Sequence, residues 1–216
     1  MTAARGAIDT TDMLLIHRVI RREIGALPRL FRTATNDAAR AKLVGTHAME
    51  MLDFLHNHHH GEDELLYPLL RQRVRLDADL LDRMDAQHAT VDESVGALRA
   101  DLPGWMRSPD PGISERMAAT VEAMLPVLID HLAEEEQRLL PIVARTVSQP
   151  EWDKLGEHGM GTIPVKRRLV VLGHIIEETD ESERTRFLVS VPAPARLAYR
   201  LIGKRQFTRE TAAIRG

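Results

Sequence analysis

The amino-acid sequence predicts an all-α protein whose main part is an antiparallel four-helix bundle. Aromatic residues make up only 4% of the 216 residues, whereas Leu, Ala, Arg and Glu are abundant, which favours helices over strands. Four long amphipathic stretches follow one another with short connections, and an antiparallel bundle is the simplest way to bury their apolar faces. The length allows one such domain with an appendage.

The first two helices follow from apolar spacing and capping residues. Apolar residues recur with helical spacing over residues 11–34, which predicts the first helix. Asn36 and Asp37 are typical of a helix start, so a second helix is expected from there to about Arg73. Pro68 lies inside this second stretch and predicts a kink.

The third and fourth helices are delimited in the same way. Asp77 is the predicted cap of the third helix, which is expected to end at Pro103. Residues 104–112 are rich in glycine and proline and predict a loop. Ser114 is the predicted cap of the fourth helix, which ends near Ser148.

These boundaries divide the chain into a bundle over residues 1–147 and a helical C-terminal extension over residues 148–216. The extension is expected to open with a short helix capped at Ser148, followed by helices over about 164–179 and within 192–203. Its helices are too short to form a second bundle. The residues expected to interrupt the first of them are Gly159, Gly161 and Pro164.

Charge is unevenly distributed along the chain. The net charge is -3, which gives no reason to expect a nucleic-acid partner. Residues 184–216 nevertheless carry eight Arg or Lys and one acid, so this tail is basic and the remainder acidic. The tail therefore either binds an anionic partner or docks on the acidic body, and the second interpretation is the simpler one.

Composition also restricts the location and the chemistry. The chain has no cysteine, which excludes disulfides, iron–sulfur clusters and thiol nucleophiles, so a bound metal must use histidine and carboxylate ligands. The start of the chain lacks a signal-peptide profile and no apolar run is long enough to span a membrane. We expect a cytoplasmic protein, and any self-association is expected to be weak.

An internal repeat contains the residues that indicate metal chemistry. The segments HHHGEDELLYPLL and HLAEEEQRLLPIV align without a gap. The alignment pairs His58 and Glu62 with His131 and Glu135, and in both segments a proline follows six residues after the glutamate. Because residues four apart lie on one helix face, each motif directs a His and a Glu to the same place.

Each repeat also has a single histidine on its preceding helix. His17 precedes His58, and His88 precedes His131, at similar distances along the chain. All four histidines continue apolar stripes, so the bundle is expected to bring them into the core, where polar groups are costly unless paired or metal-bound. The predicted metal ligands are His17, His58, Glu62, His88, His131 and Glu135.

Other polar residues near these motifs leave alternatives. His60 with Glu64 has the same spacing as His58 with Glu62, but only His58 matches the second repeat. His47 is interpreted as a core residue, and Asp92, four residues after His88, is either an additional ligand or a surface acid. The remaining neighbours, expected at the rim or surface, are His56, His59, His60, Glu64, Glu134 and Glu136, and His158 and His174 receive no role.

Imidazole and carboxylate ligands without sulfur suit iron, manganese or zinc. If both glutamates bridge two ions and an oxo or hydroxo group bridges them as well, roughly ten of twelve octahedral positions are filled. About two positions then stay open, which suits the binding of O2, peroxide or NO better than a sealed structural site.

The ligand pattern resembles that of hemerythrin-like (HHE cation-binding) proteins, and the helical extension resembles that of actinobacterial members. The resemblance covers residues 11–147. It implies an up-down-up-down four-helix bundle with a non-haem di-iron centre. The oxygen-carrying members have one more histidine on the third helix, where this chain has Met84 or Asp92, and an Asp in the position of Glu135.

The predicted metal site is compatible with three functions. The first is a di-iron protein that binds and decomposes a small oxidant, with hydrogen peroxide ahead of NO. The second is a non-enzymatic O2 or iron sensor or store. The third is a dinuclear zinc or manganese hydrolase, but the chain has no Gly-rich loop or arginine cluster near the motifs for a phosphate group.

Overall fold

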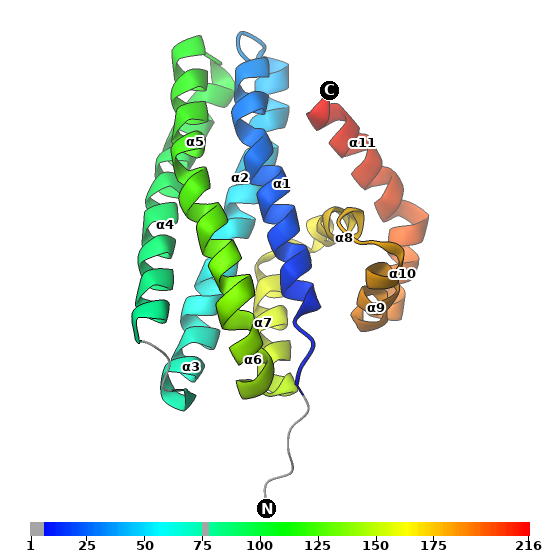
Figure 1. Ribbon diagram of the computed structural model, residues 1–216. Coiled ribbons are helices and arrows are strands. Elements are labelled where there is room, and N and C mark those ends of the chain that lie inside the picture. Colours follow the sequence, from blue (N-terminus) through cyan, green and yellow to red (C-terminus); the bar gives the residue numbers. More distant parts are fainter. Residues whose placement is uncertain (1–6, 75–77) are drawn as a thin grey trace, which may run out of the picture.

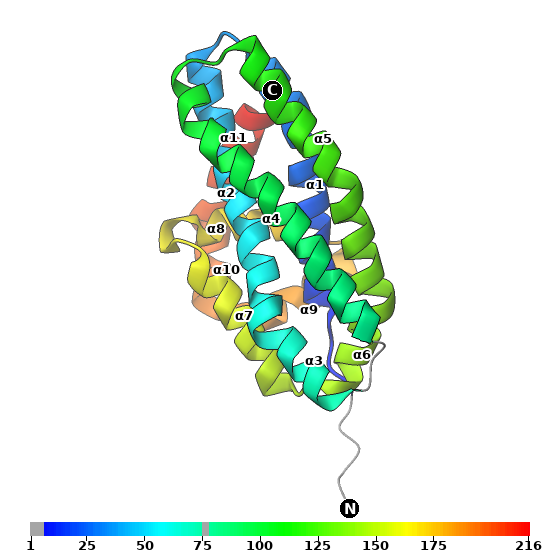
Figure 2. The ribbon, with the colours of Figure 1, turned by 90° about the vertical axis from the view of Figure 1, so that its left-hand side faces the viewer.

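A four-helix bundle forms the body of the protein. The computed structural model describes residues 7–74 and 78–216. Successive long helices of the bundle run in opposite directions, and each packs on two neighbours (Figures 1 and 2). The predicted all-α fold is confirmed. The four helices are α1 (Thr11–Thr33), α2 (Ala38–Gly61), α4 (Ala78–Arg107) and α5 (Pro111–Glu134).

The junction between α4 and α5 differs from the prediction. Helix α4 continues through Pro103 to Arg107, because the turn after the proline places Trp105 in the core with no exposed surface. The residue that caps α5 is Asp110, whose side chain accepts hydrogen bonds from two backbone N–H groups. Ser114 is buried inside α5, where its hydroxyl accepts a hydrogen bond from the Trp105 indole at 2.7 Å. The long loop and the Ser114 cap were therefore wrong.

The predicted start of the second helix agrees with the structure. Asp37 caps α2 as predicted, because its side chain accepts a hydrogen bond from the backbone N–H of Arg40. Asp77, the predicted cap of the third helix, lies outside the described residues.

Both repeats contain a widened helical turn at their glutamate. Helix α2 continues into the π-helical turn η1 (Glu62–Leu66) and then α3 (Tyr67–Arg73). Helix α5 continues in the same way into η2 (Glu135–Leu139) and α6 (Leu140–Thr146). A proline follows each π turn and has no N–H to donate to the preceding turn, which favours the wider winding. The kink predicted at Pro68 is this π turn.

The C-terminal extension is entirely built of short helices. The capping box at Ser148 and Glu151 is present as predicted, but α7 runs through both of the glycines that were expected to interrupt it. Helices α9 and α11 were not predicted. The elements are α7 (Gln149–Thr162), η3 (Val165–Arg167), α8 (Arg168–Glu177), α9 (Glu181–Ser190), α10 (Ala193–Ala198), η4 (Tyr199–Gly203) and α11 (Lys204–Arg215).

The extension packs against the side of the bundle formed by α1 and α2 (Figure 1). Arg215 at the end of the basic tail lies 2.7 Å from Glu177 and 3.0 Å from Glu23. Arg167 joins Glu50 on α2 to Glu210 on α11, at 2.6 and 2.8 Å. These ion pairs support the interpretation that the tail docks on the acidic body.

Two apolar clusters fill the bundle and leave a polar layer between them. One cluster includes Ile20, Leu55, Val91 and Leu128, toward one end of the four long helices. The other includes Met13, Leu66, Met84 and Leu139, toward the opposite end. On every bundle helix the predicted metal ligands lie between these residues. None of the helices in the part of the chain that the structure describes has the length and hydrophobicity of a membrane span.

Candidate metal centre

Seven buried or nearly buried side chains form the polar layer, with at least one from each bundle helix. The layer contains all six residues predicted as ligands and one further histidine. The backbone positions them because α2 and α5 each enter a π turn at the glutamate, which turns that carboxylate toward the histidines on neighbouring helices. The polar layer consists of His17, His58, His59, Glu62, His88, His131 and Glu135.

One group of ligand atoms lies on the α1 side of the layer. Single ligand atoms of His17, His58, Glu62 and Glu135 all lie within 4.8 Å of one another. Nε2 of His17 is 3.3 Å from Oε2 of Glu135, and Nε2 of His58 is 3.3 Å from Oε1 of Glu62. Two imidazoles and two carboxylates thus converge on one place.

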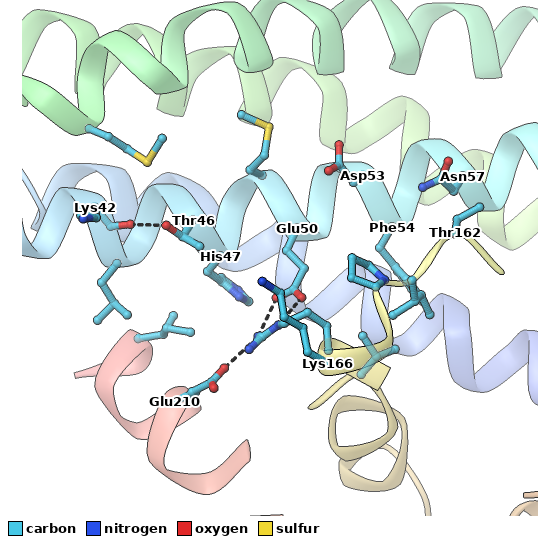
Figure 3. Close-up of a pocket in the computed structure, with 18 of the residues that line it drawn as sticks. Lys42, Thr46, His47, Glu50, Asp53, Phe54, Asn57, Thr162, Lys166 and Glu210 are labelled. Carbon is cyan, nitrogen blue, oxygen red and sulfur yellow. Dashed lines mark hydrogen bonds and ion pairs between the residues drawn. The ribbon is translucent and has the colours of Figure 1, made fainter. Parts of the chain in front are cut away.

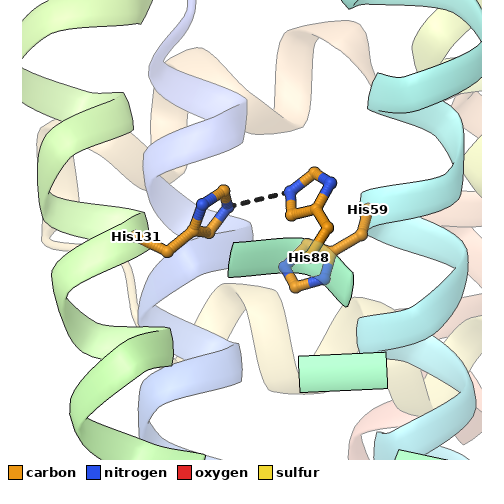
Figure 4. Close-up of side chains that lie close together, drawn as sticks. All are labelled: His59, His88 and His131. Atoms are coloured by element: carbon orange, nitrogen blue, oxygen red, sulfur yellow. Dashed lines mark hydrogen bonds between the residues drawn. The ribbon is translucent and has the colours of Figure 1, made fainter. Parts of the chain in front are cut away.

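A second group consists of three histidines from three helices. His59 on α2, His88 on α4 and His131 on α5 point toward one another (Figure 4), and one nitrogen of each lies within 4.8 Å of the others. The His59 ring stacks on His88 with ring centroids 4.0 Å apart. Nε2 of His88 lies 3.1 Å from Nε2 of His131.

The two carboxylates face both groups. Oε2 of Glu62, the oxygen that does not face His58, is 3.6 Å from Nε2 of His88. Oε2 of Glu135, which faces His17, is also 3.9 Å from Nε2 of His131. Each glutamate therefore lies between the two groups, as a bridging carboxylate does in a dinuclear site.

Hydrogen bonds fix the orientation of three imidazoles. Nδ1 of His88 donates to Asp63 at 2.7 Å, and Nδ1 of His17 donates to Glu136 at 2.9 Å. Asp63 and Glu136 occupy equivalent positions of the repeat, directly after the two glutamates of the layer. Nδ1 of His131 donates to the side-chain oxygen of Gln87 at 3.2 Å. In each ring Nε2 is thereby left to bind a cation. Glu136, expected at the rim, is thus part of the site's support.

Several buried polar atoms of the layer have no hydrogen-bond partner among the described residues. Such atoms are costly in a protein core, and their convergence is typical of a metal site. The donor set, imidazole nitrogen and carboxylate oxygen, fits a transition-metal ion. The atoms are Nε2 of His17 and His58, both ring nitrogens of His59, and both carboxylate oxygens of Glu62 and Glu135.

Burial keeps most of these imidazoles neutral. Burial lowers the pKa of His131 to about 4 and holds the pKa values of His58 and His59 well below their usual range. Burial and the charge of Glu135 raise the pKa of Glu62 well above its usual value. Neutral imidazole is the form that binds metals, so the layer is prepared to receive a cation without first losing protons from these rings.

His59 was expected at the surface and is instead 1% exposed. Comparison of the two repeats did not indicate a ligand at His59, because the equivalent residue of the second repeat is Leu132, which is also fully buried. The signal was nonetheless in the sequence: Leu55 and His59 have the same i, i+4 spacing as Leu128 and Leu132. A buried leucine in one repeat thus predicts an inward-facing His59 in the other.

Tyr67 is a second residue that sequence reasoning missed. It is 2% exposed, and its hydroxyl lies 3.4 Å from Nε2 of His88. The first residue after η1 therefore reaches the polar layer. The equivalent residue in the other repeat is Leu140, which carries no polar atom in its side chain.

The alternatives weighed from the sequence lie outside the layer. His60 and Glu64 pair at 3.2 Å with about half of each side chain exposed, so the alternative register faces solvent. Asp92 accepts a hydrogen bond from His56 at 2.9 Å, away from the layer. His47 is buried, as predicted, and pairs with Glu23 at 2.9 Å.

The chain was compared with known proteins. Its residues 9–143 match the family described as the hemerythrin HHE cation binding domain, a segment that contains the whole polar layer. A search of curated proteins and a search of solved structures found no match.

Proposed function

Because the chain belongs to the hemerythrin HHE cation-binding family, we propose that the polar layer holds two iron ions and binds a small oxidant. His17 and His58 would hold one ion, and His59, His88 and His131 the other. Glu62 and Glu135 would bridge the two. Cation binding is the family's property, and the choice of iron, the ligand set and the oxidant are this proposal.

The observation that carries the proposal is the approach of two imidazole nitrogens. Nε2 of His88 and Nε2 of His131 are 3.1 Å apart, while Nδ1 of each ring donates to an oxygen of Asp63 or Gln87. In neutral rings both Nε2 atoms then present lone pairs to each other, which repel. A shared cation removes the repulsion, and the unpartnered nitrogens of His59 next to them favour a metal ion over a proton.

When bound, the two irons would supply redox chemistry and a vacant coordination position for a small molecule. The number of such positions depends on His59. Four histidines left about two positions open, and a fifth imidazole fills one of these, so about one stays open. The chain thus provides, from α2, the histidine that it lacks on the third helix when compared with the oxygen-carrying members.

Other side chains control the surroundings of the layer. Tyr67 keeps its proton because burial raises its pKa well above the usual value, so its hydroxyl is a hydrogen-bond donor beside His88. Asp63, Gln87 and Glu136 keep protons on the Nδ1 atoms that face them. The apolar clusters on both sides exclude water, which strengthens these interactions.

The oxidant we propose first is hydrogen peroxide, with NO second, and its decomposition is the proposed activity. A second function, non-enzymatic O2 or iron binding, is favoured by one observation. The fifth histidine leaves about one open position, which suits reversible binding as well as turnover. We propose a cytoplasmic location for either function.

An oxygen electrode separates the two functions. Iron-loaded protein is mixed with hydrogen peroxide, and O2 release is followed for the wild type and for Glu62→Ala and Glu135→Ala. Decomposition predicts O2 release by the wild type that both variants lose. Protein with full iron content that releases no O2 and consumes no NO, but gives an oxygenated spectrum reversed under vacuum, would establish the binding function instead.

A further inference from the structure

An apolar cavity of about 490 Å³, partly open to solvent, lies between the bundle and the C-terminal extension. Residues of α1 and α2 form one wall, and residues of α7, α8, α9 and α10 form the others. Most of the lining residues therefore come from beyond residue 143, outside the segment that matches the family. The cavity is a property of this chain's extension and is not explained by the hemerythrin match.

The cavity reaches the polar layer at one residue. Among the seven residues of the layer, His58 is the one that lines it. Gly61, one turn further along α2, allows α7 to approach closely, because a Cβ atom there would lie 3.2 Å from side-chain atoms of Leu155 and His158. Helix α7 is thus held against α2 next to the proposed metal centre, with the cavity between them.

The cavity is far larger than the oxidants proposed above require. A water molecule occupies roughly 30 Å³ of liquid, and sites for organic ligands have volumes of about 300–1,000 Å³. A volume of about 490 Å³ falls in the second range. The walls are mainly apolar and suit a hydrocarbon body. They include Trp152, Leu155, Leu169, Leu172, Ile175 and Phe187.

Two nitrogen-bearing side chains in the lining point to an acidic head group. Arg168 makes one hydrogen bond within the described residues, from Nε to the Ile163 carbonyl at 3.2 Å, so its terminal nitrogens are free. Nε2 of His158 is buried and has no partner among those residues. The acid in the lining, Asp12, is already bound by the Trp152 indole at 3.2 Å.

We propose that this cavity binds an apolar monocarboxylic acid, with its hydrocarbon body among the apolar walls and its carboxylate on Arg168. Its placement beside a metal centre, through His58, rests on the proposed function. Binding of the acid in the cavity does not depend on the proposed function, because no proposed metal ligand other than His58 contributes to the walls.

The larger hollow of about 850 Å³, which lies along α2 toward its first residues, does not support a comparable proposal (Figure 3). No residue of the polar layer lines it among those the structure describes. Its arginine, Arg167, is already paired with Glu50 and Glu210. The two hollows share part of a wall, including Phe54, Asn57 and Ile163.

The test uses decanoate as probe, decan-1-ol as the neutral probe of equal chain length, and isothermal titration calorimetry on the iron-loaded full chain. Gly159 lines the cavity, and a Cβ atom added there meets nothing within 4 Å. The side chain of Gly159→Phe therefore has room at its Cβ and should narrow the cavity. Gly161→Phe is the matched control, because Gly161 has equally free space on the same helix but is not in the lining.

We expect decanoate to bind wild type and Gly161→Phe equally and Gly159→Phe at least about tenfold more weakly, a difference of about 1.4 kcal/mol. Arg168→Met should reduce decanoate affinity to that of decan-1-ol. Equal decanoate binding by wild type and Gly159→Phe, or no binding at all, would overturn the site. Equal wild-type affinities for the two probes would overturn the assignment of an acid.

Metal content, measured on the same samples, separates this proposal from the preceding one. Protein that carries two irons but does not bind decanoate contradicts the cavity proposal alone. Protein that binds decanoate but takes up no metal contradicts the proposed function and leaves the cavity site supported. Placement beside the centre predicts that decanoate shifts the optical spectrum of wild type but not that of Gly159→Phe.

Discussion

The ring of His59 lies parallel to that of His88, at a centroid distance of 4.0 Å and an interplanar angle of 13°. The two residues come from different helices, and both are buried. His59 has no hydrogen-bond partner for either nitrogen within the described residues. If it is the fifth imidazole ligand, its removal affects the metal and not merely the packing.

Replacement of His59 should therefore weaken the second ion. We expect His59→Leu, which copies Leu132 of the other repeat, to fold and to bind fewer than two irons per chain, because one of three imidazoles is lost. Metal analysis of purified protein measures this. His60→Leu is the control, since His60 is exposed and paired with Glu64. Full occupancy in His59→Leu would restrict the site to the six residues of the repeat.

The acids behind the histidines should affect metal affinity without contacting the metal. Asp63→Asn and Glu136→Gln weaken the bonds that orient His88 and His17, so each should reduce metal affinity by about 10–100-fold. Competition with a chelator measures the affinity. Glu64→Gln alters the exposed acid that directly follows Asp63 and should have no effect. Unchanged affinity in both variants would show that these hydrogen bonds are not needed for metal binding.

In metal-free protein the low pKa of His131 should make its contribution to stability decrease as the pH falls, opposite to the contributions of His17 and Glu62, whose pKa values are raised. The pKa of His131 is about 4 in the folded state and about 6.5 when unfolded, so the unfolded chain binds the proton first. The free energy of unfolding then decreases as the pH falls from about 6.5 to about 4, by up to about 1.4 kcal/mol per pH unit for this group. His58 and His59 act in the same direction because burial also lowers their pKa values.

Urea denaturation of metal-free protein at several pH values measures this dependence. The variant His131→Leu should have a shallower pH dependence, because it lacks one of the titrating groups. Metal-loaded protein should be more stable than metal-free protein at neutral pH, since each unpaired buried polar group costs about 1–3 kcal/mol. Identical stability of both forms would mean that the polar layer does not bind the metal.

The extension should be held to the bundle by the buried Glu23. This carboxylate lies 2.9 Å from His47, 3.2 Å from His174 and 3.0 Å from Arg215, so it joins α1 to α2, α8 and α11. Glu23→Gln should lower the free energy of unfolding by about 1–3 kcal/mol, because its buried carboxylate is the acceptor that these three partners share. The control Glu115→Gln breaks an exposed pair with Arg32 and should have a much smaller effect. Similar losses in both variants would contradict a special role for Glu23.

The sequence and the structure agree where the chain repeats itself. The His-x3-Glu spacing, the two single histidines and the following prolines are enough to predict the six side chains that the bundle brings together, because helix periodicity fixes the face on which each lies. His59 was not predicted as part of the polar layer because the second repeat has no equivalent histidine. Tyr67 was not predicted to contact the polar layer because a π turn precedes it, and that turn changes the helix face on which the next residue lies.

The boundaries were less predictable where tertiary packing overrides local preference. Pro103 normally ends a helix, yet burial of Trp105 and its bond to Ser114 stabilise one more turn. The helical tail, with its many arginines, has few apolar residues of its own, and Phe207 and Ile214 become buried only against the rest of the fold. No local pattern contains that information.

Iron content and the optical spectrum of protein purified from iron-supplemented cells show whether the polar layer holds a di-iron centre. We predict two irons per chain and the near-ultraviolet absorption of an oxo-bridged di-ferric pair, both lost in His131→Ala. A correctly folded wild-type protein, shown by its helical circular dichroism, that contains one metal ion, none, or an ion that His131→Ala retains would contradict this prediction.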